Sequence, residues 1–183
     1  MGDLNMLMTK LKGEFITDSG LINYSGMKKS PLFEEYQELA GNLSRFDATQ
    51  LSDLDRKTFF INLYNCQTLH VLANQADLPR SPKDTEGMWS KYAYNVGGLI
   101  LTLDELEHGV LRSNVGHPAA KKEVFGESDP RRKLVIPVLD PRIHFALNCG
   151  AKSCPPIRIY QSEKLDKQLE IAAKSFCSQV RKN

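Results

Sequence analysis

The chain has 183 residues, of which 41% are apolar, and this is enough to build a hydrophobic core without disulfide or metal crosslinks. Its 24 basic and 22 acidic residues nearly cancel, which argues against a nucleic-acid-binding protein and against an electrostatic membrane anchor. No segment approaches the roughly 18 consecutive apolar residues of a membrane span, and the N-terminal segment lacks the apolar core of a signal peptide. We therefore expect one cytoplasmic domain over residues 1–183, with no nucleic-acid or membrane partner.

Two helices are predicted before residue 50. Apolar residues at helical spacing predict a short helix over residues 4–11, and Gly13 is expected to end it. Ser30 followed by Pro31 is a typical helix start, because serine caps the first turn and proline suits the first helical position. This second helix is expected to end near Gly41.

The strongest helical signal follows a capping box that begins at Ser52. Nothing interrupts the pattern over residues 53–74, and apolar side chains occur on nearly every side, so this helix is expected to lie at the centre of the domain. Asn62, Asn65 and His70 lie within it, and buried amides and imidazoles need hydrogen-bond partners. They are expected either to bind the backbone of neighbouring loops or to have a direct functional role.

The middle of the chain predicts a hairpin followed by a helix. Residues 92–95 and 99–101 flank a two-glycine turn and predict two short strands. Thr102 with Glu105 then forms a second capping box that opens a helix of about ten residues. Residues 114–130, which are rich in glycine and proline, predict a long loop at the rim of a site.

A second hairpin is predicted from residues 134–139 and 143–148, which flank an Asp-Pro-Arg turn. In the latter strand His144 and Asn148 alternate with large apolar residues, so both are expected on the same face. A short strand over residues 157–160 is expected to follow.

A last helix, capped by Ser162, has an apolar stripe and no stop signal, so we expect the natural domain to continue or the sequence to be a fragment of a longer protein. Helices, hairpins and the lack of βαβ alternation together predict an α+β fold. We expect a single domain in which a central buried helix and further helices pack on a small antiparallel sheet.

The segment after the predicted hairpin contains the parts of a thiol hydrolase. Such an enzyme needs a cysteine, a histidine within hydrogen-bond reach and a third group that orients the histidine. Cys149 and Cys154 are candidate nucleophiles, and His144 is the candidate base. Because Pro155 disfavours a helical conformation at Cys154, activation would rest on the histidine. The candidate orienting residues are Asn62, Asn65, Glu107 and Asp140.

Other interpretations of the same residues remain open. His144, Cys149 and Cys154 could bind a metal, although the usual short cysteine pairs of zinc sites are absent, and we expect no metal and no cofactor. The two cysteines could instead form a redox dithiol, or lie in a structural loop with inert thiols. The irregular spacing of all four cysteines is unlike a secreted disulfide framework, so we expect reduced thiols. Cys66 and Cys177 are expected to pack as small hydrophobic residues.

Three segments resemble the Domain of Unknown Function 547 family: Phe-Phe-Ile-Asn-Leu-Tyr-Asn at 59–65, Leu-Asp-Glu-Leu-Glu-His-Gly-Val-Leu-Arg at 103–112, and the run at 140–156 that holds the two cysteines. The resemblance extends over roughly residues 14–182. Members of this family occur as bacterial proteins, at the end of plant leucine-zipper proteins, and in animal proteins with glutaredoxin and DEP domains. The resemblance implies no settled catalytic mechanism, and this chain has neither a zipper heptad nor a glutaredoxin motif.

Polar residues gather in these three otherwise apolar motifs, so we expect a cleft where the segments meet. The catalytic candidates there are Cys154, Cys149, His144, Glu107 and Asn65. The substrate-binding candidates are Asn62, Tyr64, His108, Arg112, Arg142, Asn148 and Ser153. Two functions are expected as alternatives. One is a papain-like or transglutaminase-like thiol hydrolase or acyl transferase, and the other is a non-catalytic module that binds a protein or peptide in signalling or redox-linked multidomain proteins.

Overall fold

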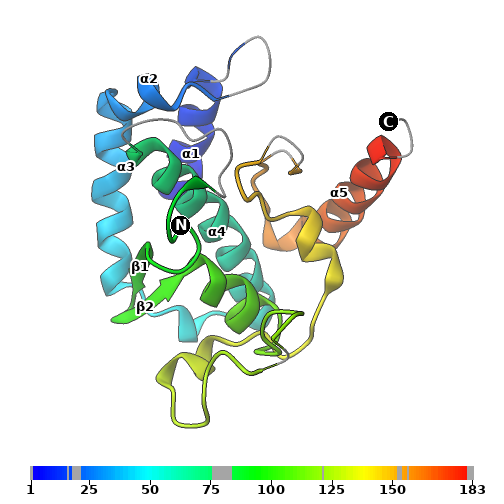
Figure 1. Cartoon of the computed structure of the whole chain (residues 1–183). Helices are drawn as coiled ribbons and strands as arrows, with labels where there is room; N and C mark the ends of the chain where they lie inside the picture. The colour runs from blue at the N-terminus through cyan, green and yellow to red at the C-terminus, as the bar shows by residue number, and fades with distance from the viewer. Residues whose placement is uncertain are drawn as a thin grey trace.

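The computed structural model describes residues 2–15, 17, 22–75, 84–120, 122–151, 154–155 and 157–180. At its centre lies α4 (Asp53–Asn74), with the N-terminal helices on one side and α5 (Leu165–Val180) on the other (Figure 1). Every residue from 58 to 69 is buried, so α4 is surrounded by protein as predicted. The N-terminal helices are α1 (Gly2–Phe15), α2 (Tyr24–Lys28) and α3 (Pro31–Asn42).

The predicted helix starts are confirmed for α3 and α4. The hydroxyl groups of Ser30 and Ser52 each accept a hydrogen bond of 3.2 Å from the backbone N–H three residues further on. The prediction that Gly13 ends the first helix is wrong, because α1 continues beyond it. Leu7 and Leu11 of α1 are buried in the core, and this packing outweighs the low helix propensity of one glycine.

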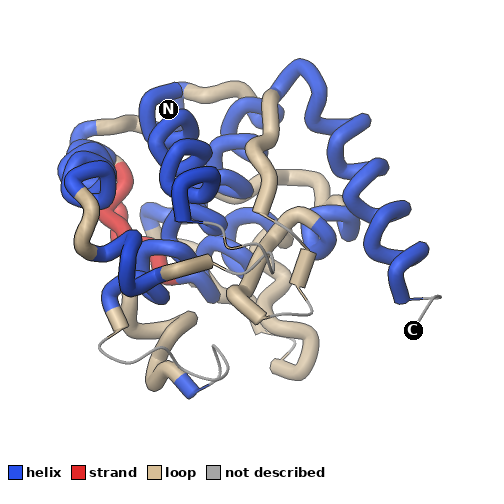
Figure 2. Tube along the Cα trace, turned by 90° about the horizontal axis from the view of Figure 1, so that it is seen from above, coloured by secondary structure: helices blue, strands red, loops and turns tan. Residues whose placement is uncertain are grey.

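The predicted glycine hairpin is also confirmed. β1 (Ala93–Val96) and β2 (Leu99–Thr102) pair antiparallel, and Gly97 and Gly98 between them have φ values of 59° and 84°, as a tight two-residue turn requires. This is the only sheet among the residues that the structure describes, and it lies on the opposite side of the molecule from α5 (Figure 2). The chain therefore has the predicted α+β fold.

The hairpin predicted over residues 134–148 is wrong. Residues 135–140 are irregular, and a short helix lies on each side of them. Both helices begin with Asp-Pro-Arg: the aspartate side chain accepts a hydrogen bond from the arginine N–H, and proline takes the first helical position. This local capping overrides the alternating apolar pattern, so His144 and Asn148 do not share a strand face. The short helices among the described residues are η1 (Leu43–Arg45), η2 (Ala48–Gln50), η4 (Glu105–Leu111), η5 (Pro130–Leu134), η6 (Pro141–Phe145) and η7 (Ser162–Lys164).

The strand predicted over residues 157–160 is likewise wrong, because side-chain amides take the place of a β-ladder. The buried Asn62 amide donates to the carbonyl oxygen of Tyr160 and accepts from its N–H, both at 2.9 Å. Gln168 of α5 binds the flanking C=O and N–H groups in the same way, at 3.0 Å and 2.8 Å. The backbone of this extended segment is thereby satisfied without a neighbouring strand.

His70 lies in a chain of hydrogen bonds that joins α3, α4 and β1. Its Nδ1 lies 2.7 Å from the Tyr94 hydroxyl, which lies 2.9 Å from the Tyr36 hydroxyl. Burial lowers the pKa of His70 to about 4, so the folded protein holds a neutral imidazole at neutral pH. The role of His70 in the structure is therefore to connect elements of the core.

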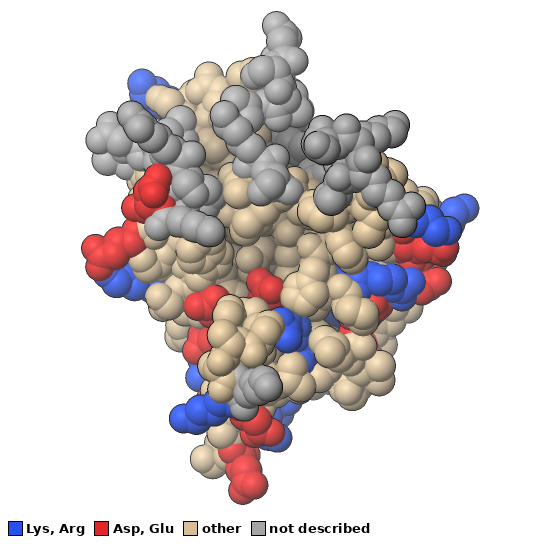
Figure 3. All heavy atoms as spheres, turned by 45° about the vertical axis from the view of Figure 1, so that its right-hand side comes forward, with Lys and Arg blue, Asp and Glu red and all other residues tan. Residues whose placement is uncertain are grey.

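Acidic and basic side chains are interspersed on the surface. On the face shown in Figure 3 they lie beside one another at the edges, and a few acidic and basic groups also lie near the centre of the face. Within the described part of the chain, no helix combines the length and the apolar character needed to cross a membrane.

Replacing Asn62 tests how much its two buried hydrogen bonds to the backbone of Tyr160 contribute to stability. Asn62→Ala is expected to lower the free energy of unfolding by about 2–4 kcal/mol, because two buried backbone groups of Tyr160 lose their partner. The matched control is Gln168→Ala, which removes the same two kinds of hydrogen bond nearer the surface and should cost less than about 1 kcal/mol. Urea denaturation measures both, and equal losses would contradict the importance of burial.

The neutral His70 predicts a pH dependence of stability. Between about pH 6.5 and pH 4 the unfolded chain protonates His70 while the folded protein does not, so the free energy of unfolding should fall by about 3 kcal/mol as the pH drops through this range. In the His70→Gln variant this part of the decrease should vanish. Urea denaturation at several pH values gives the difference between the two curves, and parallel curves would show that His70 does not titrate differently on unfolding.

Candidate functional site

Glu107 of η4 and His144 of η6 come together although they are far apart in the sequence. Glu107 Oε1 lies 3.3 Å from His144 Nδ1. The histidine side chain is 40% exposed and the carboxylate only 20%, so the imidazole is accessible while the carboxylate behind it is sheltered. A carboxylate at Nδ1 leaves Nε2 as the nitrogen that can exchange protons with a bound molecule, which is the arrangement of a general base and its orienting group.

The surroundings of Glu107 keep it ionised. Burial alone would raise the pKa of this carboxyl group, but the hydrogen bond from His144, the nearby His108 and a hydrogen-bonding interaction with Tyr64 together bring the pKa below its ordinary value. Burial and the adjacent Glu107 carboxylate raise the pKa of Tyr64, so this phenol stays protonated and can donate. Glu107 is therefore an anion at neutral pH, as an orienting group must be.

The helix that carries Glu107 is a π-helix and not the ordinary helix that the capping box predicted. The predicted capping interactions are present, with Glu105 Oε2 accepting from the Thr102 N–H at 2.9 Å. Further along, the N–H of Arg112 donates to the carbonyl oxygen of Glu107 at 2.9 Å, the five-residue step of a π-helix. Such wide turns are rare and are frequent at functional sites.

Two residues after η4 have left-handed backbone conformations. Ser113 and Asn114 have φ values of 55° and 61°, which are uncommon for residues other than glycine. The Asn114 side chain holds this turn in place by accepting from the N–H of Phe125 at 2.8 Å and donating to its carbonyl oxygen at 2.9 Å. The end of η4 is therefore a backbone turn kept in an uncommon conformation by its surroundings.

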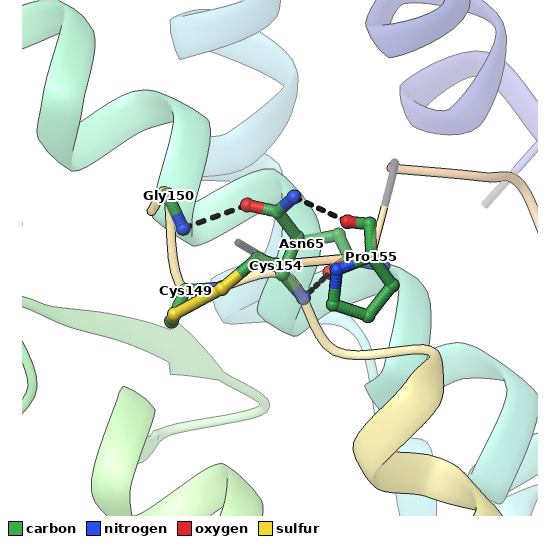
Figure 4. The surroundings of a disulfide bond; sticks show 6 residues. Asn65, Cys149, Gly150, Cys154 and Pro155 are labelled. Carbon is green, nitrogen blue, oxygen red and sulfur yellow. Dashed lines mark hydrogen bonds between the residues drawn. A yellow bond between two sulfur atoms is a disulfide. The ribbon is translucent and has the colours of Figure 1, made fainter. Parts of the chain in front are cut away.

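The buried Asn65 of α4 holds the segment that follows His144. Its amide donates to the carbonyl oxygen of Ala146 at 3.0 Å, and its Oδ1 accepts from the N–H of Asn148 at 2.8 Å. The Asn148 side chain continues the network to Gly150 and Pro155, at 2.7 Å and 2.6 Å (Figure 4). Asn65 therefore positions the cysteine loop through hydrogen bonds to its backbone.

Cys149 and Cys154 form a disulfide bond (Figure 4), so the expectation of reduced thiols is wrong for this pair. The loop they close is short, and the N–H of Cys149 also donates to Cys154 Sγ at 3.3 Å. Of the two cysteines outside the disulfide, Cys66 is buried as expected, and burial raises its pKa to about 12. Cys177 is exposed, contrary to the expectation that it packs as a hydrophobic residue.

The sequence model of the family described as "Protein of unknown function, DUF547" matches residues 48–177. The chain belongs to the DUF547 family. The match includes α4, η4, η6 and the disulfide loop, so every element that forms the site lies within the DUF547 domain. No curated protein and no solved structure matches the chain.

The structure of the DUF547 domain separates the candidate residues into two groups. Glu107, His144, Tyr64 and His108 lie together, and Arg112 lies near His108. Asn62, Asn65 and Asn148 bind the backbone, and Arg142 pairs with Asp140 at 2.9 Å and with Asp166 at 2.8 Å. Ser153 lies outside the described residues.

Asp140 is not free to orient His144. Lys57 contacts it at 2.7 Å, and hydrogen bonds from Arg142 and Lys57 hold the pKa of Asp140 well below its ordinary value. Sequence reasoning missed two residues of the DUF547 site, Asp104 and His117. The His117 ring lies edge-on to the His108 ring, with 5.0 Å between centroids, and no pattern in its loop indicates this contact.

Among the described residues there is no group of three or more His, Cys, Asp or Glu side chains arranged to hold a metal ion. The described side chains could support proton transfer at His144 and, after reduction, reaction at sulfur.

Removing His144 should change the ionisation of Glu107. In the His144→Gln variant the pKa of Glu107 is expected to rise above its value in the wild-type protein. Burial raises this pKa, and the interactions with His144 that lower it are lost. Carbon-13 NMR titration of the Glu107 side-chain carboxyl measures this pKa. Arg142→Gln, which removes a charge from the same short helix, should leave it unchanged, because Arg142 pairs with other carboxylates. An unchanged pKa in His144→Gln would show that the pair is not formed.

Proposed function

We propose that this DUF547 domain is a thiol hydrolase or acyl transferase with a papain-like or transglutaminase-like site, active when the disulfide is reduced. Cys154 is the nucleophile, His144 the base, and Glu107 the residue that orients the imidazole. The observation that carries the proposal is the pair of Glu107 and His144, with 3.3 Å between Oε1 and Nδ1 and the histidine more exposed than the carboxylate. Asn65 is a positioning residue, since it binds the backbone between His144 and the cysteines.

Cys154 is preferred over Cys149 because of the hydrogen bond to its sulfur. The N–H of Cys149 donates to Cys154 Sγ at 3.3 Å. After reduction the same N–H can stabilise a thiolate at Cys154, because hydrogen bonds to the charged form lower the pKa of an acid. Cys149 is then the partner that closes the disulfide, and the disulfide protects the nucleophile from irreversible oxidation to a sulfinic or sulfonic acid.

The proposed reaction starts with a thiol reductant, which becomes oxidised as it gives two electrons and two protons to the disulfide. His144 removes the proton from Cys154, and the thiolate forms a bond to the acyl carbon of the substrate. The bond from that carbon to the leaving group breaks, and the leaving group departs with the proton from His144. Water or another nucleophile, deprotonated by His144, then takes the acyl group from the sulfur.

Paired cysteine variants test this assignment on a generic ester, p-nitrophenyl acetate. Cys149→Ser should hydrolyse the ester without reductant, because no disulfide can form, whereas Cys154→Ser should be inactive with and without reductant. His144→Gln should reduce kcat/KM by about 100-fold, and Glu107→Gln by about 10-fold, since general-base catalysis contributes factors of this order. Cys177→Ser is the control, because this exposed cysteine is outside the loop.

Alkylation with iodoacetamide supplies a second readout. In the reduced protein Cys154 should react faster at pH 6 than Cys177, as a thiolate stabilised by its surroundings does. If Cys154 reacts no faster than Cys177, and if Cys149→Ser and Cys154→Ser hydrolyse the ester equally, the thiol-enzyme proposal is wrong.

The alternative is a non-catalytic module that binds a protein or peptide. It is favoured by Val138 and Leu139, whose apolar side chains are 73% and 42% exposed immediately before η6. An inactive, unreactive reduced protein in the experiments above would favour this alternative over the enzyme.

A further inference from the structure

Three buried polar atoms in η4 and the two residues after it have no hydrogen-bond partner among the described residues. His108 is only 8% exposed, and its Nδ1 makes no hydrogen bond to the described residues. The Nε of Arg112 is buried and lacks a partner in the same part of the chain, as does the Oγ of the adjacent Ser113. Buried polar groups are normally paired, and each unpaired one costs roughly 1–3 kcal/mol. Three such atoms lie within residues 108–113, which makes this segment a candidate for binding a polar group.

The charges around these atoms favour a single negative charge. His108 and Arg112 lie four positions apart, about one helical turn, and are close enough to interact electrostatically. Unlike Arg131 and Arg142, Arg112 forms no ion pair with a described residue. The His117 ring packs edge-on against the His108 ring.

Two carboxyl groups also face His108, and they limit what can bind. Glu107 is adjacent to it but is paired with His144, and Asp104 interacts with it electrostatically; burial raises the pKa of Asp104 above its ordinary value. A dianion such as phosphate would be repelled by these groups more strongly than a monoanion. A planar carboxylate matches the planar guanidinium of arginine, which can donate two parallel hydrogen bonds to it.

We propose that His108 and Arg112, with Ser113, bind a carboxylate group of the substrate, so that this DUF547 domain acts on carboxylate-bearing acyl compounds. This inference rests on the proposed function for the reaction, but the binding site itself does not require the thiol. Because His108 follows Glu107 directly, the bound carboxylate is held next to the residue that orients His144.

Binding of glutarate to the full-length oxidised chain tests the site without any catalysis. Glutarate should shift the NMR signals of the His108 ring, and its neutral analogue glutaramide should not, because it lacks the charge that pairs with Arg112. Arg112→Gln should weaken glutarate binding by about tenfold or more, since hydrogen bonds to charged groups contribute energies of this order. Arg158→Gln, which removes a charge from an exposed position, is the matched control and should leave the affinity unchanged.

Variants at His108 provide a second test, with circular dichroism to verify folding. His108→Phe should weaken glutarate binding with Arg112 intact, and His108→Asn, which retains a side-chain donor, should weaken it less. Glutaramide binding as tightly as glutarate, no change in Arg112→Gln, or inorganic phosphate binding more tightly than glutarate would each overturn the proposal.

The two proposals can fail separately. If glutarate binds as expected but reduced protein does not hydrolyse esters, the carboxylate site stands and the thiol-enzyme proposal is wrong. If esters are hydrolysed and glutarate does not bind, the thiol-enzyme proposal stands and the carboxylate-site proposal is wrong.

Discussion

Buried side-chain amides of α4 hold together the irregular parts of this fold. Asn62 binds the N–H and C=O of Tyr160, and Asn65 binds Ala146 and Asn148 in the same two-sided way. Gln67 donates to the carbonyl oxygen of Tyr92 just before the hairpin. An amide can donate and accept at once, so each one satisfies backbone groups that would otherwise need a neighbouring strand. A chain with only one small sheet among its described residues can therefore place long non-helical segments against a buried helix.

The same arrangement brings the candidate site together. Asn65 fixes the segment between η6 and the disulfide, and this places His144 against the carboxylate of Glu107 on η4. The wide turn of η4 and the two left-handed residues after it have backbone conformations that are normally unfavourable. Conformations of this kind persist only where surrounding contacts enforce them, and here Asn114 supplies those contacts.

Sequence patterns predicted elements well where local chemistry and burial agree. The serine caps of α3 and α4 and the two-glycine turn determine their elements through contacts within a few residues. The alternating pattern over residues 134–148 predicted strands wrongly, because alternation reports which side chains are buried and says nothing about which backbone groups are paired. The Asp-Pro-Arg starts of η5 and η6 are also visible in the sequence, and this local capping signal determines the backbone conformation there.

What the sequence by itself determined is the central helix, the glycine hairpin, the α+β class and membership of a family whose motifs contain the polar residues of the site. These depend on periodicity, caps and residue type, which are local properties. Only the tertiary structure decided that Glu107, and not Asp140 or Asn62, contacts His144, and that Cys149 and Cys154 are joined. It also decided that His108 Nδ1 and Arg112 Nε are buried without a hydrogen bond to the described residues. Pairing between residues distant in the chain depends on how α4, η4 and η6 pack, and no spacing within one segment encodes it.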